Sequence, residues 1–134
     1  MNLKKINNTD IVKWNPLKLK GSVLMYLEGL HDDYEGFRLV LKGEKEEDKC
    51  VKLLFESNLG YRNLDESQRL KTLNENPILT EKWSFYKTNK SLFLDWFKNE
   101  SYNVYDSKEI THYIITTPND IIDIISDEEP IVEM

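Results

Sequence analysis

Three stretches in the first half of the chain alternate apolar and polar side chains, and they lie at residues 22–28, 37–42 and 51–56. A period of two places every second side chain on the same face of a strand, so this pattern predicts strands with one face buried. The segments between them have the composition of turns and loops, with H-D-D-Y-E-G at 31–36 and a strongly charged run at 43–49. The three stretches therefore predict an antiparallel meander.

Residues 57–80 have no sustained period of either kind, and we expect this part of the chain to be mostly irregular. Inside it, Asp65 is a candidate N-cap for a short helix. Gln68 follows three residues later, where a capping box places its second side chain. A fourth strand is expected at 81–86, after Pro77.

The strongest helix pattern lies at residues 91–101. Ser91 is a suitable N-cap. The apolar side chains that follow form two pairs at i and i+4, Leu92 with Trp96 and Phe93 with Phe97. Such pairs stack along one side of a helix, so we expect this helix to cover the sheet. If the Trp96 ring is buried, its truncation to alanine should cost about 3–5 kcal/mol.

The last third of the chain predicts a hairpin. Residues 110–115 alternate, T-P-N-D at 117–120 is a turn sequence with proline at its second position, and 121–125 contains four isoleucines. A capping-box helix that begins at Thr117 is the competing interpretation. We favour the strand because β-branched side chains prefer a sheet.

The length of 134 residues, with 40% hydrophobic residues, is sufficient for one domain with its own core. The chain contains no alanine, the residue with the highest helix propensity, and this disfavours a mostly helical fold. We therefore predict a single α+β domain over residues 1–134. Its antiparallel sheet should have about five to seven strands, with one main helix, about 91–101, packed on it.

The single cysteine, Cys50, cannot form an internal disulfide, so nothing indicates an oxidising compartment. The N-terminal segment lacks the apolar run of a signal peptide, and no stretch reaches the ~18 apolar residues of a membrane span. We therefore expect a cytoplasmic protein that does not bind membranes.

The net charge of −6 is unevenly distributed. Residues 1–21 hold five lysines against Asp10 alone and are expected to form a basic arm or a short helix. Lys108 is the last lysine or arginine, and seven acidic residues follow it. An acidic chain repels the phosphate backbone, so we do not expect a nucleic-acid partner.

Three features could carry chemistry, and each has a simpler structural interpretation that we favour. The donors at 31–35 could hold a metal ion, but Asp and Gly also dominate ordinary turns. His112 could be a general base, or a hydrogen-bonded histidine in a half-buried sheet. Cys50 lacks a local partner that would make it a nucleophile. No phosphate-binding glycine motif is present. We therefore assign no catalytic residue, cofactor or metal.

Two surfaces are candidates for binding another protein. Tyr61 and Arg62 are of the residue types enriched where proteins meet tightly, although Arg62 could instead pair with Asp65 or Glu66. The second candidate is an acidic surface on the C-terminal hairpin, which could attract a basic partner or only add solubility. Its residues are Asp120, Asp123, Asp127, Glu128 and Glu129. Asp123 interrupts the isoleucine run and must face solvent, a cation or a partner.

The chain contains the segments W-F-x-x-E-S at 96–101, H-Y-I-I-T at 112–116 and D-E-E-P at 127–130, and we expect a compact acidic domain with an antiparallel sheet and one aromatic-rich helix. In this overall style, over most of residues 22–134, it resembles the small immunity proteins of bacterial polymorphic toxin systems. The resemblance implies a non-enzymatic cytoplasmic inhibitor that covers the active site of a basic toxin domain, such as a nuclease.

Two other functions remain open. One is a small-ligand-binding domain or an enzyme of unrecognised type, with a pocket between sheet and helix near Trp83, Trp96 and His112. The other is a structural subunit of a homo-oligomer, which an exposed apolar sheet face would mark.

Overall fold

The computed structural model describes residues 10–18, 23–45 and 50–134. The strands among these residues are β1 (Val12–Lys13), β2 (Tyr26–Asp33), β3 (Gly36–Lys42), β4 (Cys50–Phe55), β5 (Asn58–Asp65), β6 (Phe85–Thr88), β7 (Thr111–Thr116), β8 (Asp120–Ser126) and β9 (Ile131–Glu133). The helices there are α1 (Leu70–Glu75) and α2 (Leu92–Glu100), with the 3-10 turns η1 (Glu66–Gln68) and η2 (Pro77–Thr80). The α+β class is confirmed.

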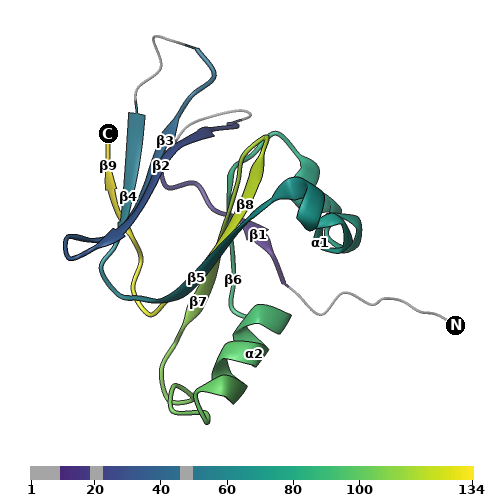
Figure 1. The fold of residues 1–134 in the computed structure, drawn as a ribbon. Coiled ribbons are helices and arrows are strands. Elements are labelled where there is room, and N and C mark those ends of the chain that lie inside the picture. Colours follow the sequence, from purple (N-terminus) through teal and green to yellow (C-terminus); the bar gives the residue numbers. More distant parts are fainter. Residues whose placement is uncertain (1–9, 19–22, 46–49) are drawn as a thin grey trace, which may run out of the picture.

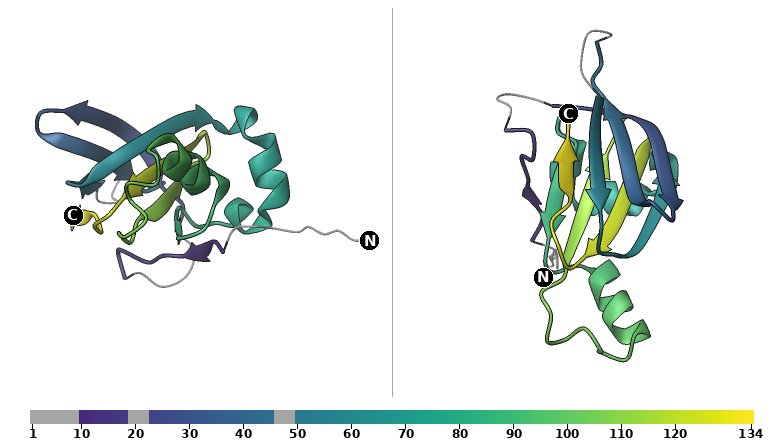
Figure 2. Two further views of the ribbon diagram at one scale, coloured as in Figure 1. Left: turned by 90° about the horizontal axis from the view of Figure 1, so that it is seen from below. Right: turned by 90° about the vertical axis from the view of Figure 1, so that its left-hand side faces the viewer.

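The strands form two antiparallel sheets instead of one. The five-stranded sheet has the order β1-β6-β7-β8-β5, and the four-stranded sheet has the order β2-β3-β4-β9. The sheets overlap face to face (Figure 2). Both helices lie on the outer side of the five-stranded sheet, away from the four-stranded one, so the molecule has three layers (Figure 1).

The main core lies between the two sheets. The side chains that fill it from the four-stranded sheet are Phe37, Leu39, Leu41, Val51, Leu53 and Phe55. Those from the five-stranded sheet include Phe85, Tyr113, Ile115, Ile122 and Ile124. The rings of Phe55 and Tyr113 meet across this core with their centroids 5.4 Å apart. Because neighbouring side chains of a strand point to opposite faces, the alternate residues of β7 and β8 point toward the helices.

The meander predicted from the alternating stretches is confirmed, with β3 paired to both β2 and β4. The first turn is narrower than 31–36, because β2 continues to Asp33 and only Tyr34 and Glu35 form the turn. The Asp33 carboxylate accepts hydrogen bonds from the Glu35 amide and the Arg38 guanidinium, which closes the hairpin. Gly36 ends this turn with φ +107°, a backbone conformation that L side chains rarely adopt. Residues 46–49 of the expected loop lie outside the described residues.

The expectation that residues 57–80 are mostly irregular was wrong, because the eight-residue strand β5 lies there. It pairs along its length with β8. Asp65 is confirmed as an N-cap, since its side chain accepts from the Ser67 amide. Gln68 does not complete a capping box and instead bonds the Ser67 hydroxyl. The next strand, β6, lies later than the expected 81–86.

The candidate basic arm was wrong for residues 10–18. Strand β1 pairs with β6 in the five-stranded sheet. The Trp14 amide donates to the Phe85 carbonyl, and the Trp14 carbonyl accepts from the Trp83 indole. The Leu17 side chain is buried in the main core. The rest of the expected arm lies outside the described residues.

The C-terminal hairpin of β7 and β8 is confirmed, and the competing helix at Thr117 was wrong. The Thr117 hydroxyl accepts from the amides of Asn119 and Asp120, so it closes a turn. The helix expected at 91–101 is confirmed as α2, with Ser91 as its N-cap. Its position is different from our expectation: α2 covers only one end of the sheet, and Trp96 is 56% exposed. Because the Trp96 ring is not buried, the loss of about 3–5 kcal/mol expected for its truncation to alanine does not apply.

Two adjacent leucines of β4 test which face of this strand points into the main core. Leu53 is fully buried in the main core, whereas Leu54 is only partly buried on the other face. We expect Leu53→Ala to lower the free energy of unfolding by about 2–5 kcal/mol because it leaves a cavity. Leu54→Ala should cost about half of that or less. Urea unfolding followed by circular dichroism measures both, and equal losses would contradict the assigned faces.

Candidate functional site

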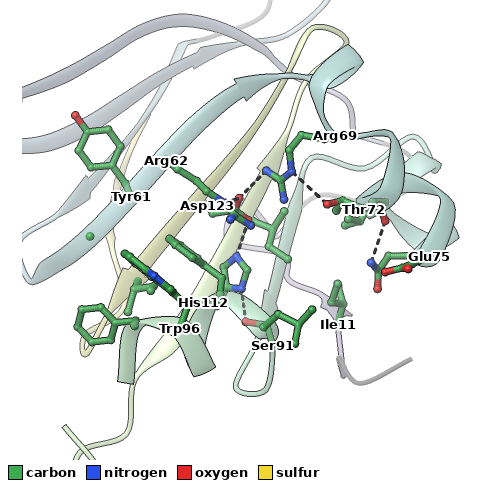
Figure 3. A pocket seen from close by; sticks show the side chains of 18 of the residues that line it. Ile11, Tyr61, Arg62, Arg69, Thr72, Glu75, Ser91, Trp96, His112 and Asp123 are labelled. Carbon is green, nitrogen blue, oxygen red and sulfur yellow. Dashed lines mark hydrogen bonds and ion pairs between the residues drawn. The ribbon is translucent and has the colours of Figure 1, made fainter. Parts of the chain in front are cut away.

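A groove of about 1430 Å³ lies on the outer face of the five-stranded sheet, between α1 and α2. Strands β5, β7 and β8 provide its floor, which includes Arg62, His112 and Asp123 (Figure 3). Residues of α1 and of the chain beside it form one wall, and α2 forms the other. The helices cover the two ends of the sheet and leave its centre open, so buried polar groups of the floor line an open groove.

Asp123 is the centre of this floor. It is 1% exposed, and its Oδ2 accepts from Arg62 Nε and from an Arg69 Nη, each at 2.7 Å. Its Oδ1 lies 2.6 Å from His112 Nε2. Burial by itself would raise the pKa of Asp123, but the hydrogen bond with His112 and the charges of its histidine and arginine neighbours hold that pKa well below its usual value. Asp123 is therefore an ionised carboxylate that accepts three hydrogen bonds.

The second ring nitrogen of His112 extends this network to α2. His112 Nδ1 lies 2.8 Å from Ser91 Oγ, which also accepts from the Leu94 amide as the helix cap. Because ionised Asp123 can only accept, His112 Nε2 carries a proton. In the neutral ring, Nδ1 then accepts from the Ser91 hydroxyl. The chain Ser91–His112–Asp123 thus fixes the start of α2 to the sheet.

The α2 side of the groove exposes a large apolar surface, which we call the aromatic wall and which consists of Leu92, Phe93 and Trp96. Leu92 and Trp96 are 62% and 56% exposed, whereas Phe93 is buried. The rings of Phe93 and Trp96 are stacked, with centroids 5.9 Å apart and planes within 6°. The Arg62 guanidinium lies over Phe93, 4.2 Å from the ring centroid. Cation and aromatic wall are therefore in direct contact.

The structure separates the two loop residues expected to form one binding surface. Tyr61 and Arg62 lie in β5 and point to opposite faces. The Tyr61 ring points away from the cluster around Asp123 (Figure 3) and packs on the Phe37 ring, with the ring centroids 4.3 Å apart. Both residues line the groove, but it is Arg62 that joins the cluster on its floor, where it pairs with Asp123 rather than with Asp65 or Glu66.

The acidic residues of the hairpin do not form one continuous surface. Asp123 faces two cations inside the groove, which was one of the three environments we expected for it. Asp120 is half-buried at the turn, and Asp127 accepts from Ser57 and Lys108. Glu128 and Glu129 remain exposed.

Sequence reasoning missed Arg69, the buried cation that pairs with Asp123 from 54 residues away. An aspartate inside an isoleucine run was the available signal that a cation must lie nearby, but it did not indicate which one. The donors at 31–35 act within the hairpin, where Asp33 pairs with Arg38. Within residues 10–18, 23–45 and 50–134, no three His, Cys, Asp or Glu side chains are grouped to hold a metal ion.

Comparisons with protein-family models, curated proteins and solved structures find no match to this chain. In the described part of the chain, every helix is too short or too polar to cross a membrane.

Replacing Asp123 tests the central ion pairs. Asp123→Asn leaves the buried Arg69 without its counter-charge, so we expect a loss of about 3–5 kcal/mol in the free energy of unfolding near pH 7. Because the pKa of Asp123 is lowered in the folded state, this contribution is present above about pH 4 and is lost as the pH falls further. Urea unfolding near pH 7 and near pH 3 should therefore give a difference between wild type and variant that narrows in acid.

Asp33→Asn is the matched control. Asp33 also has a pKa lowered by its hydrogen bond with Arg38, but its carboxylate is exposed at the hairpin turn. Solvent screens such a pair, so this variant should lose much less stability. Equal losses in the two variants, or a difference for Asp123→Asn that is the same at both pH values, would contradict a central role for Asp123.

Proposed function

We propose that this protein is a non-enzymatic binding protein and that it receives a segment of a partner protein in the groove between α1 and α2. The observation that carries the proposal is the aromatic wall beside an open groove. Pockets for small molecules have volumes of about 300–1,000 Å³ and enclose most of the ligand. The volume of about 1430 Å³, open to solvent, better fits a piece of polypeptide.

The residue types at the groove also favour a protein partner. Tryptophan and arginine are the residues that most often dominate the binding energy at protein interfaces. Here Trp96 is stacked on Phe93 and Arg62 is held by Asp123, so both have restricted conformations before any partner arrives. Such preorganisation lowers the entropy lost on binding.

The resemblance to immunity proteins supports an inhibitory role within this proposal. Of the three segments that carry the resemblance, 96–101 includes Trp96 on the groove wall and 112–116 includes His112 on its floor. The third, 127–130, contains the exposed Glu128 and Glu129 and lies away from the groove lining. We propose that a toxin domain is the partner and that the groove, rather than the acidic hairpin, holds it.

Trp96→Ala tests the groove directly. Because the ring is half exposed, we expect stability to change by about 1 kcal/mol or less, while affinity for the partner falls at least about tenfold. Tyr34→Ala is the matched control, since Tyr34 is 97% exposed on the β2–β3 turn and is not part of the groove. A photo-crosslinking residue in place of the exposed Leu92 should capture the partner from host lysate in the wild-type and Tyr34→Ala backgrounds but not in Trp96→Ala.

The same experiment with the crosslinker at Glu128 distinguishes the acidic surface. A partner that crosslinks only there, and is retained by Trp96→Ala, would move the binding site to the hairpin and favour a basic partner. Recovery of no partner at either position would overturn the proposal.

A second candidate function, ester or amide hydrolysis, rests on the Ser91–His112–Asp123 chain. Ser91 Oγ would attack a carbonyl carbon while its proton passes to His112 Nδ1 and then to the leaving group, and water would release the acyl group. Two observations disfavour it. The Ser91 side chain is almost fully buried and accepts a helix amide, and Asp123 is already neutralised by two arginines.

A fluorophosphonate probe, read by mass spectrometry of the intact protein and its peptides, separates the two functions. We expect no adduct on Ser91, because its hydroxyl is enclosed and acts as a helix cap. An adduct on Ser91 that is lost in His112→Ala would establish a nucleophilic serine and contradict the non-enzymatic proposal. Adducts on the less buried Ser101, also at the groove, serve as the background level.

A further inference from the structure

The floor of the groove carries more positive than negative charge, although the protein as a whole is acidic. Arg62 and Arg69 share the single carboxylate of Asp123, so this cluster has a net charge of at least +1 whether or not His112 is protonated. The protein has a net charge of −6. An excess cation beside an open groove is the opposite of what the overall composition suggests.

The arginines keep hydrogen-bond donors that Asp123 does not use. The Asp123 carboxylate accepts hydrogen bonds from Arg62 Nε and from one Arg69 Nη. The Thr72 hydroxyl accepts a hydrogen bond from Arg69 Nε. In the described part of the chain, the two Nη groups of Arg62 and the second Nη of Arg69 donate to no other residue. Nor is any buried side-chain nitrogen there left without a hydrogen bond. These donors are therefore open to the groove or to solvent.

The Arg62 guanidinium is held in place for a further interaction. Its Nε is anchored on Asp123, its face lies on the Phe93 ring, and its side chain is 42% exposed. The two Nη groups form a planar fork, and such a fork matches the two oxygens of a carboxylate. A ligand carboxylate would also lie near the positive end of α2, whose first-turn amides at Leu92 and Phe93 have no partner within the helix.

The other charged groups that line the groove make its two ends differ in charge. On the α1 wall, Lys71 and Glu75 pair with each other at 2.9 Å and cancel. Glu100 stands at the far end of α2, about 12 Å along the helix axis from Leu92. The groove is thus cationic at the start of α2 and acidic at its end, so an acidic group is favoured at one end only.

We propose that the groove selects a partner segment in which an aspartate or glutamate lies close to an aromatic residue. The carboxylate binds the free fork of Arg62 with support from Arg69, and the aromatic ring packs on Trp96 and Leu92. This inference rests on the proposed function and specifies its ligand. Because the net charge of −6 repels an acidic partner at long range, selection depends on contacts inside the groove rather than on steering.

The experiment is a selection of random dodecapeptides displayed on phage against the wild-type protein, with removal of peptides that also bind Trp96→Ala. We expect the retained peptides to combine an acidic and an aromatic residue. Selected peptides are then synthesised with the acid or with its amide, Asn or Gln, and titrated by calorimetry. The amide form should bind wild type at least about tenfold more weakly, the effect of losing a charged bidentate pair.

Arg62→Gln completes a double-mutant cycle with the same peptides. This variant should bind the acid form at least about tenfold more weakly and should no longer distinguish acid from amide. Lys52→Gln is the matched control, because it removes an exposed cation that is paired with Glu133 on the four-stranded sheet, outside the groove. It should leave affinity nearly unchanged. Arg62→Lys, which keeps the charge but lacks the fork, should recover only part of the affinity.

The outcomes separate this inference from the function on which it rests. Peptides that depend on Trp96 but are neutral or basic would overturn the acidic ligand and leave the groove as a binding site. If the selection yields no peptide whose binding depends on Trp96, the proposed function itself is overturned. Acidic peptides that wild type binds as well in the amide form would overturn the role of the arginine fork, and this comparison does not depend on the folding of any variant.

Discussion

The buried carboxylate of Asp123 is the interaction on which the outer half of this molecule depends. An unpaired charge in the interior is prohibitive, so β8 can carry an aspartate among isoleucines only if cations and donors surround it. Arg62 from β5, Arg69 from the start of α1 and His112 from β7 meet this requirement. One side chain therefore connects three separate segments of the chain to strand β8.

The same network determines the shape of the groove. Arg69 holds the start of α1 over the sheet, and the Ser91–His112 bond holds the start of α2, so the two helices stay apart and the floor remains open. A sheet face covered by one continuous helix would have no such opening. The groove is then lined by groups that are already ordered, which lowers the entropy lost when a partner binds.

Charge along the sequence is a poor guide to charge on the surface of this protein. The acidic residues of the C-terminal region are close together in the sequence and predict one acidic surface. In the structure, however, Asp123 is buried and paired with arginines, while Glu128 and Glu129 are exposed to solvent. Conversely, the excess cation of the groove comes from Arg62 and Arg69, which lie seven residues apart in a segment without a helix or strand pattern. The immunity-protein resemblance therefore supports an inhibitory binding role better through Trp96 and His112 than through the acidic residues.

The sequence by itself determined the elements whose signals are local. Alternation specified the β2–β4 meander and the β7–β8 hairpin, and the Ser91 cap with the pairs that follow it specified α2, because these patterns depend on neighbouring residues. Tertiary structure decided the rest. Strand β5 has polar residues on both faces and is a strand because it pairs with β8, with Arg62 and Asp123 separated by 61 residues. The two-sheet division, the exposure of Trp96 and the groove likewise depend on contacts between distant segments, which no local period encodes.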